Sequence, residues 1–252
     1  MSRNGLNLGA TAGLLGIGAL AAYTSPLLCL APAIGTRLTP ALVGMGRAGH
    51  VALSFDDGPD PASTPLFLDA LAGLGWRATF FMLGTMARRE PGLTREVADA
   101  GHEIAVHGDA HISMMRRRPS AITDDITRAR DSIAELTGTQ PRWFRPPYGT
   151  LSWPALSAAV HLELATVLWT AWGRDWRQGA SPAGVVADVC KGRLDGGTVL
   201  LHDSDCTSYP GSWRSTLGAL PILADELARQ ALEVGPLAEH GVAPRRFPAK
   251  AP

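Results

Sequence analysis

The chain has 252 residues, with 23 basic and 23 acidic side chains and a formal net charge of zero. This length suffices for one large domain or two small ones. The neutral balance disfavours nucleic-acid binding, which needs a basic surface to displace counterions, so no nucleic-acid partner is expected. The three cysteines, Cys29, Cys190 and Cys206, show no paired spacing and indicate neither a disulfide framework nor a cysteine-based zinc site.

The N-terminal segment is almost free of charge from residue 6 to residue 34. It is long enough to cross a bilayer, which takes about 20 residues. Arg3 supplies a positive start, and Ala31-Pro32-Ala33 resembles a small-residue cleavage site. Three interpretations stay open: a cleaved signal peptide, an uncleaved membrane anchor, or a helix packed on the domain. The first two predict an extracytoplasmic protein, secreted or membrane-anchored, and the third a cytoplasmic one.

The rest of the chain divides by composition into three parts. Residues 35–49 are punctuated by Pro and Gly and are predicted to be a linker. A folded domain is predicted over residues 50–240, and residues 241–252 form a tail. The sequence therefore predicts one domain behind an apolar segment at residues 1–34.

Within the domain, short apolar runs alternate with amphipathic segments. Strands are predicted at residues 51–55, 78–83, 101–106, 142–144, 164–169, 197–201 and 232–234. Helices are predicted at residues 64–74, 91–100, 120–136, 153–160, 182–190 and 217–230. This alternation is typical of α/β folds with parallel strands and right-handed crossovers. Because no Gly-rich nucleotide loop follows the first strand, a barrel is favoured over an open sheet.

The first strand ends in SFDDGPD, which contains the neighbouring carboxylates Asp56 and Asp57. Neighbouring side chains on an extended backbone point in opposite directions. The pair can therefore divide two tasks, such as holding a metal and moving a proton. Taken alone, the segment also fits an ordinary Asp-rich turn.

The third strand is followed by HGDAH, in which His107 and His111 are four residues apart. On a helical turn this spacing places both imidazoles on one face. Two histidines and a carboxylate make a common facial site for zinc or a similar metal, with positions left for water and substrate. Alone, such a pair is more often a structural or surface feature.

Later strand ends carry further polar residues. Arg145 is a permanent cation that can orient a carboxylate, and the prolines before Tyr148 can fix its N–H toward a developing oxyanion. Asp175 follows the fifth predicted strand, at residues 164–169, and His202 comes directly after the sixth, at residues 197–201. A histidine beside a carboxylate is the arrangement of a general acid. The alternative is a rigid Pro turn with a surface arginine and a structural histidine.

The segments SFDDGPD, HGDAH, RPPYG, RDW and LLH, in this order, resemble the five motifs of the polysaccharide deacetylases. These are the NodB-like domain enzymes of carbohydrate esterase family 4, and the resemblance covers residues 50–236. It implies a distorted, incomplete TIM-like (β/α) barrel of seven or eight units. It also implies metal-dependent removal of N-acetyl groups from amino sugars, in peptidoglycan or a chitin-like polymer.

The resemblance also implies a role for each matching residue. Asp56 resembles the general base, His202 the general acid, and Asp57, His107 and His111 the metal ligands. Arg145 resembles the residue that holds the base, Asp175 the one that tunes the acid, and Tyr148 the one whose N–H assists the oxyanion. Trp176 and Leu200 resemble the walls of the acetyl pocket. We expect Zn²⁺, although Co²⁺, Mn²⁺ or Fe²⁺ would also bind such ligands.

Three residues depart from the family pattern. Gly108 stands where a Ser or Thr usually braces the loop between the two histidines. Asp109 adds a carboxylate beside the metal, expected to be solvated or to contact substrate. Trp172 stands near a position that is often acidic, which suggests a sugar-stacking wall or a different acceptor.

The remaining histidines, His50, His102, His161 and His240, have no partner pattern and are interpreted as structural or surface residues.

Two other functions are weighed against the deacetylase. One is an amide or cyclic-imide hydrolase on the same barrel; some relatives of this kind lack the metal triad, and the intact Asp57, His107 and His111 disfavour it. The other is a non-catalytic carbohydrate-binding protein, which is expected to have lost Asp56 or His202. The expected partner is an N-acetylated glycan, and a monomer is expected.

Overall fold

The computed structural model describes residues 32–115 and 117–242. The predictions for residues 1–31 and for most of the C-terminal tail lie outside these residues. Helix α2 (Pro32–Leu38) is the first element described. Across the described ranges no helix has the length and apolar character needed to cross a membrane.

Eight parallel strands form one curled sheet in the order β5-β4-β3-β2-β1-β7-β6, with β8 paired to the start of β1. They are β1 (His50–Asp56), β2 (Thr79–Met82), β3 (Glu103–Val106), β4 (Trp143–Phe144), β5 (Ala165–Thr166), β6 (Ala171–Trp172), β7 (Thr198–His202) and β8 (Glu233–Gly235). Among the described residues no ladder joins β5 to β6, so the barrel has an open seam there. The predicted distorted, incomplete barrel is confirmed.

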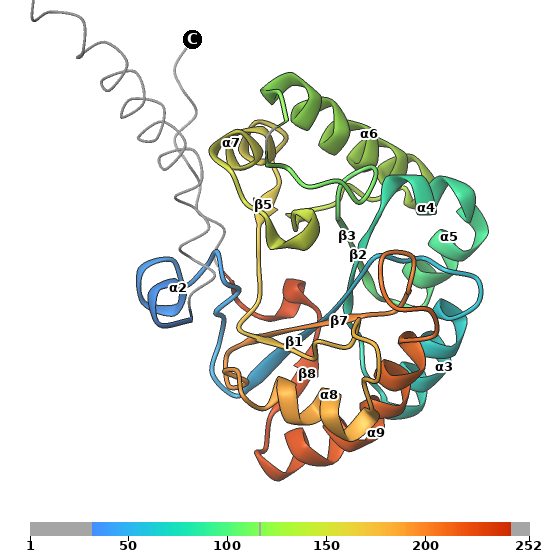
Figure 1. The fold of residues 1–252 in the computed structure, drawn as a ribbon, viewed down its shortest axis with the longest axis vertical. Helices are drawn as coiled ribbons and strands as arrows, with labels where there is room; N and C mark the ends of the chain where they lie inside the picture. The colour runs from blue at the N-terminus through green and yellow to red at the C-terminus, as the bar shows by residue number, and fades with distance from the viewer. Residues whose placement is uncertain (1–31, 116, 243–252) are drawn as a thin grey trace, which may run out of the picture.

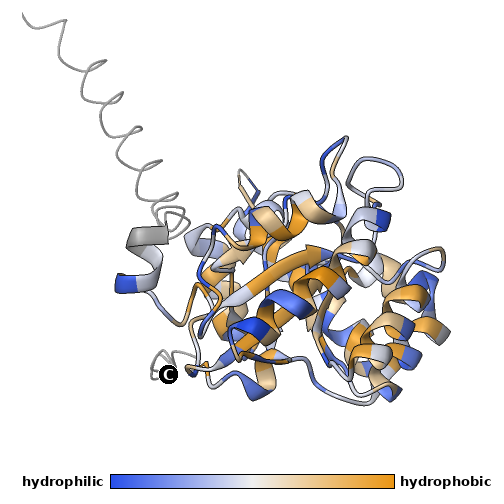
Figure 2. Ribbon diagram, turned by 90° about the horizontal axis from the view of Figure 1, so that it is seen from below, coloured by the Kyte–Doolittle hydropathy of each residue, from blue (hydrophilic) through white to orange (hydrophobic). Residues whose placement is uncertain are grey.

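Helices surround this sheet on its outer side (Figure 1). They are α3 (Thr64–Leu74), α4 (Gly84–Arg89), α5 (Pro91–Asp99), α6 (Pro119–Thr137), α7 (Trp153–His161), α8 (Pro182–Val189) and α9 (Trp213–Arg229), with short 3₁₀ turns at Pro147–Gly149 and Leu237–Glu239. The strands are mostly hydrophobic, whereas the helices around them mix hydrophobic and hydrophilic residues (Figure 2). This pattern is expected where each helix buries one face.

Strand residues alternate between two separate cores. On β1, Val51, Leu53 and Phe55 join the large cluster that packs against the helices. Ala52, from the other face, joins a small cluster inside the barrel with Phe81 and its neighbours. The side chains that follow Ala52 on this inner face are Ser54 and Asp56, both buried. The period of two along a strand therefore aims polar groups into the barrel at its carboxyl end.

The strand register brings the carboxyl ends to one level. Asp56 is paired with Phe81 on β2 and with His202 on β7. Val106 is paired with Met82 on one side and Phe144 on the other. The residues that follow these strands therefore meet at one rim, as expected for parallel barrels.

Several elements differ from the sequence predictions. The strand predicted at residues 164–169 pairs only over Ala165–Thr166, because Leu168 N–H turns to the Leu42 carbonyl instead. A separate strand, β6, lies in a segment expected to be a loop. Helix α4 was not predicted, because GTMARR is too short to show a period. Helix α9 begins four residues early, since Trp213 and Thr216 are buried on its inner face.

The segment predicted to be a linker contacts the base of the barrel. Thr198 Oγ1 donates to Gly44 O at 2.7 Å, and Arg47 N–H donates to His240 O at 2.7 Å. Below β1, the buried rings of His50 and His240 lie with their Nδ1 atoms 2.8 Å apart. These contacts anchor residues 44–50 to the C-terminal end of the domain.

Candidate active site

The residues after the strands surround one pocket of about 260 Å³. It is lined by Asp56, Asp57, His107, His111, Tyr148, Gly149, Trp169, Trp172, Trp176, Leu200, His202, Thr207 and Ser208. Arg145 and Asp175 lie behind this lining and are buried. The structure therefore brings all the predicted site residues into one region, whereas none of His50, His102, His161 and His240 lines the pocket.

Asp56 and Asp57 both face the pocket, which differs from the expected divergence of neighbouring side chains. Asp57 has φ of 81°, in the left-handed region that favours glycine. This conformation ends the alternation of β1, so that both carboxylates approach His107: Asp57 Oδ1 at 3.4 Å and Asp56 Oδ2 at 3.7 Å from its Nε2. A non-glycine residue in this region costs on the order of 1–3 kcal/mol, and such strain clusters at functional sites.

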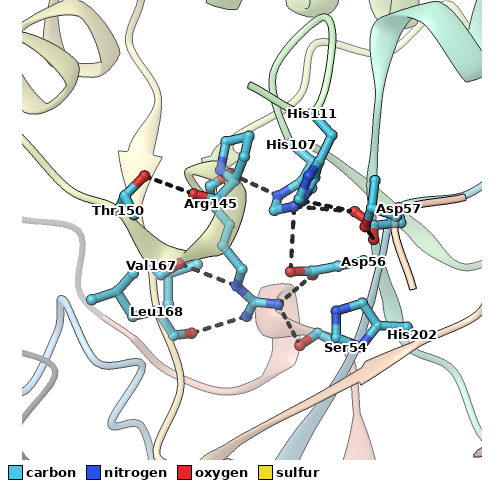
Figure 3. A network of polar contacts seen from close by, with 12 residues as sticks. Ser54, Asp56, Asp57, His107, His111, Arg145, Thr150, Val167, Leu168 and His202 are labelled. Carbon is cyan, nitrogen blue, oxygen red and sulfur yellow. Dashed lines mark hydrogen bonds and ion pairs between the residues drawn. The ribbon is translucent and has the colours of Figure 1, made fainter. Parts of the chain in front are cut away.

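Asp57, His107 and His111 form a candidate metal site. The Nε2 atoms of both histidines lie 3.4 Å from Asp57 Oδ1, which is buried and has no hydrogen-bond partner within residues 32–115 and 117–242. A tetrahedral metal about 2.0–2.1 Å from each ligand would hold the ligand atoms about 3.3–3.4 Å apart. His107 Nδ1 lies 2.8 Å from Arg145 O, which selects the tautomer with a proton on Nδ1 and leaves Nε2 free. The donor set therefore fits a divalent metal (Figure 3).

The protonation of these groups suits metal binding. Burial lowers the pKa of His111 to about 4 despite the neighbouring Asp57, so its imidazole is neutral near pH 7. Burial would raise the pKa of Asp57, but His202, His107 and His111 and the Thr207 hydroxyl hold it below its usual value. Ligands must be deprotonated to bind a metal, and both groups meet that condition.

Arg145 is fully buried and connects the pocket to the open seam of the barrel. Its guanidinium donates to Asp56 Oδ1 at 2.7 Å and to Ser54 Oγ at 2.9 Å. It also donates to the carbonyls of Val167 and Leu168, at 3.3 and 2.9 Å, in the segment between β5 and β6 (Figure 3). The ring of Phe81 lies 3.9 Å beneath it. One side chain thus satisfies unpaired seam carbonyls and orients the Asp56 carboxylate.

The partly buried His202 and the buried Asp175 form a pair on the opposite side of β1 from the metal site. His202 Nδ1 lies 2.9 Å from Asp175 Oδ1, while Asp175 Oδ2 accepts from the His202 backbone N–H at 2.8 Å and from Thr216 Oγ1 at 2.7 Å. Burial disfavours the charged imidazole, but Asp175, with Asp57 and Asp56 further away, outweighs it and raises the pKa to about 10. His202 is therefore protonated near pH 7 and can donate from Nε2.

Aromatic rings form one wall of the pocket. Trp172 stacks on Trp169 with ring centroids 5.7 Å apart, and Trp176 follows at 5.1 Å from Trp172 and 5.6 Å from His202. On the other side, the exposed Tyr148 ring meets His111 edge-on at 4.2 Å. Trp172 thus lines the pocket, and its role as a sugar-stacking wall, like the role of the Tyr148 N–H, stays a prediction.

Asp109 does not lie where the sequence suggested. Its carboxylate is largely buried and faces away from the metal ligands toward helices α4 and α6, where it pairs with Arg88 at 2.7 Å and Arg128 at 3.2 Å. These two arginines hold the pKa of Asp109 below its usual value against the effect of burial. The expectation that this carboxylate is solvated or contacts substrate is wrong.

Sequence reasoning missed some residues of the site. Thr207 donates to Asp57 Oδ2 at 2.6 Å from the loop after β7, and it belongs to no motif. Ser54 lies two residues before Asp56, so the period of the strand could have placed it on the same inner face. Trp169 was assigned only to a strand, although it lines the pocket.

The chain is similar to several known proteins. A family model described as Polysaccharide deacetylase matches residues 44–167. A chitooligosaccharide deacetylase from Bradyrhizobium sp. is 35% identical over 198 residues, which cover 74% of this chain and 88% of that protein. The chain belongs to the polysaccharide deacetylase family. The resemblance inferred from the five motifs is thereby confirmed.

Two further relatives extend the family assignment. A peptidoglycan-N-acetylglucosamine deacetylase from Bacillus cereus is 36% identical over 183 residues, covering 71% of this chain and 82% of that protein. A family 4 carbohydrate esterase from Streptomyces lividans, solved in complex with acetate, is 35% identical with a TM-score of 0.66. That match covers 74% of the present chain and 92% of the solved chain.

Replacing Arg145 tests its double role. In Arg145→Lys a single ammonium cannot reach Asp56, Ser54 and both seam carbonyls, so buried acceptors lose their donors. We expect the free energy of unfolding, measured with urea, to fall by about 3 kcal/mol. Arg142→Lys, at an exposed neighbouring position, should change it by less than about 0.5 kcal/mol. Equal effects of the two substitutions would contradict the assigned role.

Proposed function

We propose that this protein is a metal-dependent deacetylase that hydrolyses the N-acetyl groups of N-acetylated amino sugars in a glycan. The observation that carries the proposal is the meeting of three functional groups in one pocket. These are the candidate ligands Asp57, His107 and His111, the Arg145-held Asp56, and the protonated His202. Amide hydrolysis needs an activated water, a base and an acid for the leaving amine, and each has a candidate here.

Zn²⁺ is the metal proposed for the Asp57, His107 and His111 site. Two imidazoles and one carboxylate with open positions are a typical catalytic zinc set. Co²⁺, Mn²⁺ and Fe²⁺ would also bind these ligands. When bound, such a metal would polarise the acetyl carbonyl and lower the pKa of a nearby water.

Asp56 is the proposed general base. Its Oδ1 is engaged by Arg145 at 2.7 Å, while Oδ2 faces the pocket beside His107. Arg145 thus fixes the plane of the carboxylate and leaves one oxygen for the proton of the attacking water. The water oxygen bonds to the acetyl carbon, and the Tyr148 N–H is the proposed donor to the developing oxyanion.

His202 is the proposed general acid. Asp175 accepts from its Nδ1, which leaves Nε2 as the donor toward the pocket. When the carbon–nitrogen bond breaks, the leaving nitrogen takes the Nε2 proton and departs as the free amine of the sugar. Acetate is the other product. Leu200 and Trp176, beside His202, are the proposed walls for the acetyl methyl group.

A glycan substrate is supported by the pocket wall and by the relatives. Trp172 and Trp176 present faces on which a sugar ring can stack. Two of the similar proteins named above are deacetylases, one of chitooligosaccharides and one of peptidoglycan N-acetylglucosamine. We propose the same substrate class here. An extracytoplasmic location, secreted or membrane-anchored, is proposed with it, supported by the apolar residues 6–34 and testable by cell fractionation.

The proposal is tested by acetate release from a panel of N-acetylglucosamine polymers, including chitooligosaccharides and peptidoglycan. We expect release by the metal-replete protein and a loss of at least about 100-fold after chelation, with recovery when Zn²⁺ is restored. No release from any polymer, despite bound metal, would instead favour the amide or imide hydrolase or the carbohydrate-binding protein.

The pH dependence of activity tests the acid. Activity should fall as pH rises through the pKa of His202, which Asp175 raises to about 10. In Asp175→Asn the carboxylate charge is lost while a polar partner for His202 remains, so the pKa of His202 falls. The alkaline limb of kcat should move to lower pH by about one to two units. An unchanged alkaline limb in this variant would show that His202 is not the acid.

A further inference from the structure

The two candidate histidine ligands are held in different ways. The Nε2 atoms of both rings lie 3.4 Å from Asp57 Oδ1, but only His107 has a partner on the other side of its ring, where Nδ1 lies 2.8 Å from Arg145 O. His111 Nδ1 is buried and has no hydrogen-bond partner among the described residues. Apart from ring contacts with His107 and Tyr148 and the approach of its Nε2 to Asp57 Oδ1, its placement depends on the backbone that carries it. The loop between the two histidines must therefore be rigid.

Helix α4 holds this loop from one side. Gly84 N–H donates to Gly108 O at 3.0 Å, and Thr85 N–H donates to Asp109 O at 2.9 Å. These donors belong to the first turn of α4, whose N–H groups have no partners within the helix. Two consecutive carbonyls of the loop are thus fixed.

Asp125 holds the loop from the other side. It lies on α6, is 1% exposed, and accepts the Asp109 backbone N–H through Oδ1 at 2.8 Å. Its Oδ2 lies 3.1 Å from Arg117 Nη1 and 4.0 Å from Arg128 Nη2. The buried charge therefore has cationic partners, and the bond to the loop is charge-assisted.

Asp109 adds a third connection through its side chain. Its two carboxylate oxygens bind Arg88 on α4 and Arg128 on α6. Arg128 contacts both carboxylates, so Asp109 and Asp125 belong to one ion-pair network. This network joins the loop to both helices.

Gly108 permits the close approach of Asp125. It has φ of 92°, and a Cβ there would lie 3.1 Å from Asp125 Oδ1. A serine or threonine at this position would be strained and would crowd the carboxylate. Gly108 has no side-chain hydroxyl that could brace the loop. The Asp125 carboxylate on α6 instead accepts from the next peptide, through the Asp109 N–H.

We propose that Asp125 is a positioning residue for His111, acting through the Asp109 peptide to preorganise the metal site. This inference rests on the proposed metal-dependent function. Groups that orient metal ligands typically contribute 10–100-fold to metal affinity. Asp125 lies outside the five motifs, on the helix that follows the second.

Metal affinity of the purified full-length chain tests the proposal, with Co²⁺ as the probe. Asp125→Ala should weaken the Kd for Co²⁺ by 10–100-fold and change the Co²⁺ visible absorption spectrum. Asp125→Asn keeps an acceptor for the Asp109 N–H and should recover most of the affinity. Asp124→Ala is the matched control, because Asp124 is the exposed neighbour on α6. It should bind Co²⁺ as the wild type does.

The outcomes separate this proposal from the function on which it rests. If the wild type binds no Co²⁺, the metal-dependent function fails and the proposal with it. If the wild type binds Co²⁺ and Asp125→Ala binds equally with the same spectrum, only the positioning role is overturned. Should Asp125→Ala not fold, Arg128→Ala removes a half-exposed partner of both carboxylates. It should weaken Co²⁺ binding several-fold, and unchanged binding would overturn the proposal.

Discussion

The buried guanidinium of Arg145 is the interaction on which the site depends. A parallel barrel that fails to pair β5 with β6 leaves backbone carbonyls without partners, and buried carbonyls need donors. Arg145 donates to two of them and uses its remaining capacity on Ser54 and Asp56. Its own carbonyl lies within hydrogen-bond distance of His107 Nδ1. The same residue therefore connects the seam of the fold to the proposed base and to one candidate metal ligand.

The curled sheet explains why these groups meet. Inner-face residues of β1 and β7 reach the rim in register, which places Asp56 beside His202. The left-handed backbone of Asp57 then turns a second carboxylate toward the same pocket. Arg145 holds one oxygen of Asp56, whose other oxygen approaches His107, while Asp57 lies close to both histidines. Burial keeps His111 neutral, whereas the carboxylate of Asp175 keeps His202 charged.

Much of this arrangement could be predicted from the sequence, because period and spacing are local. The alternation of strands and helices predicts the barrel, and the polar residues at the strand ends predict which side chains meet at its rim. What could not be predicted is one backbone conformation and several contacts distant in sequence. The left-handed turn at Asp57, the Thr207 hydroxyl 150 residues away, and the pairing of Asp109 with Arg88 and Arg128 leave no local pattern. Asp109 was misplaced for this reason, since adjacency to His107 does not determine which way its side chain turns.

The division of roles between Asp56 and Asp57 is the central claim, and one paired measurement tests it most directly. Metal content and acetate release are measured together for Asp56→Asn and Asp57→Asn. The account predicts that Asp56→Asn keeps the metal content of the wild type but loses turnover, because only the proton acceptor is removed. Asp57→Asn should lose both. An Asp56→Asn variant that remains fully active, or an Asp57→Asn variant that keeps its metal and its activity, would contradict the account.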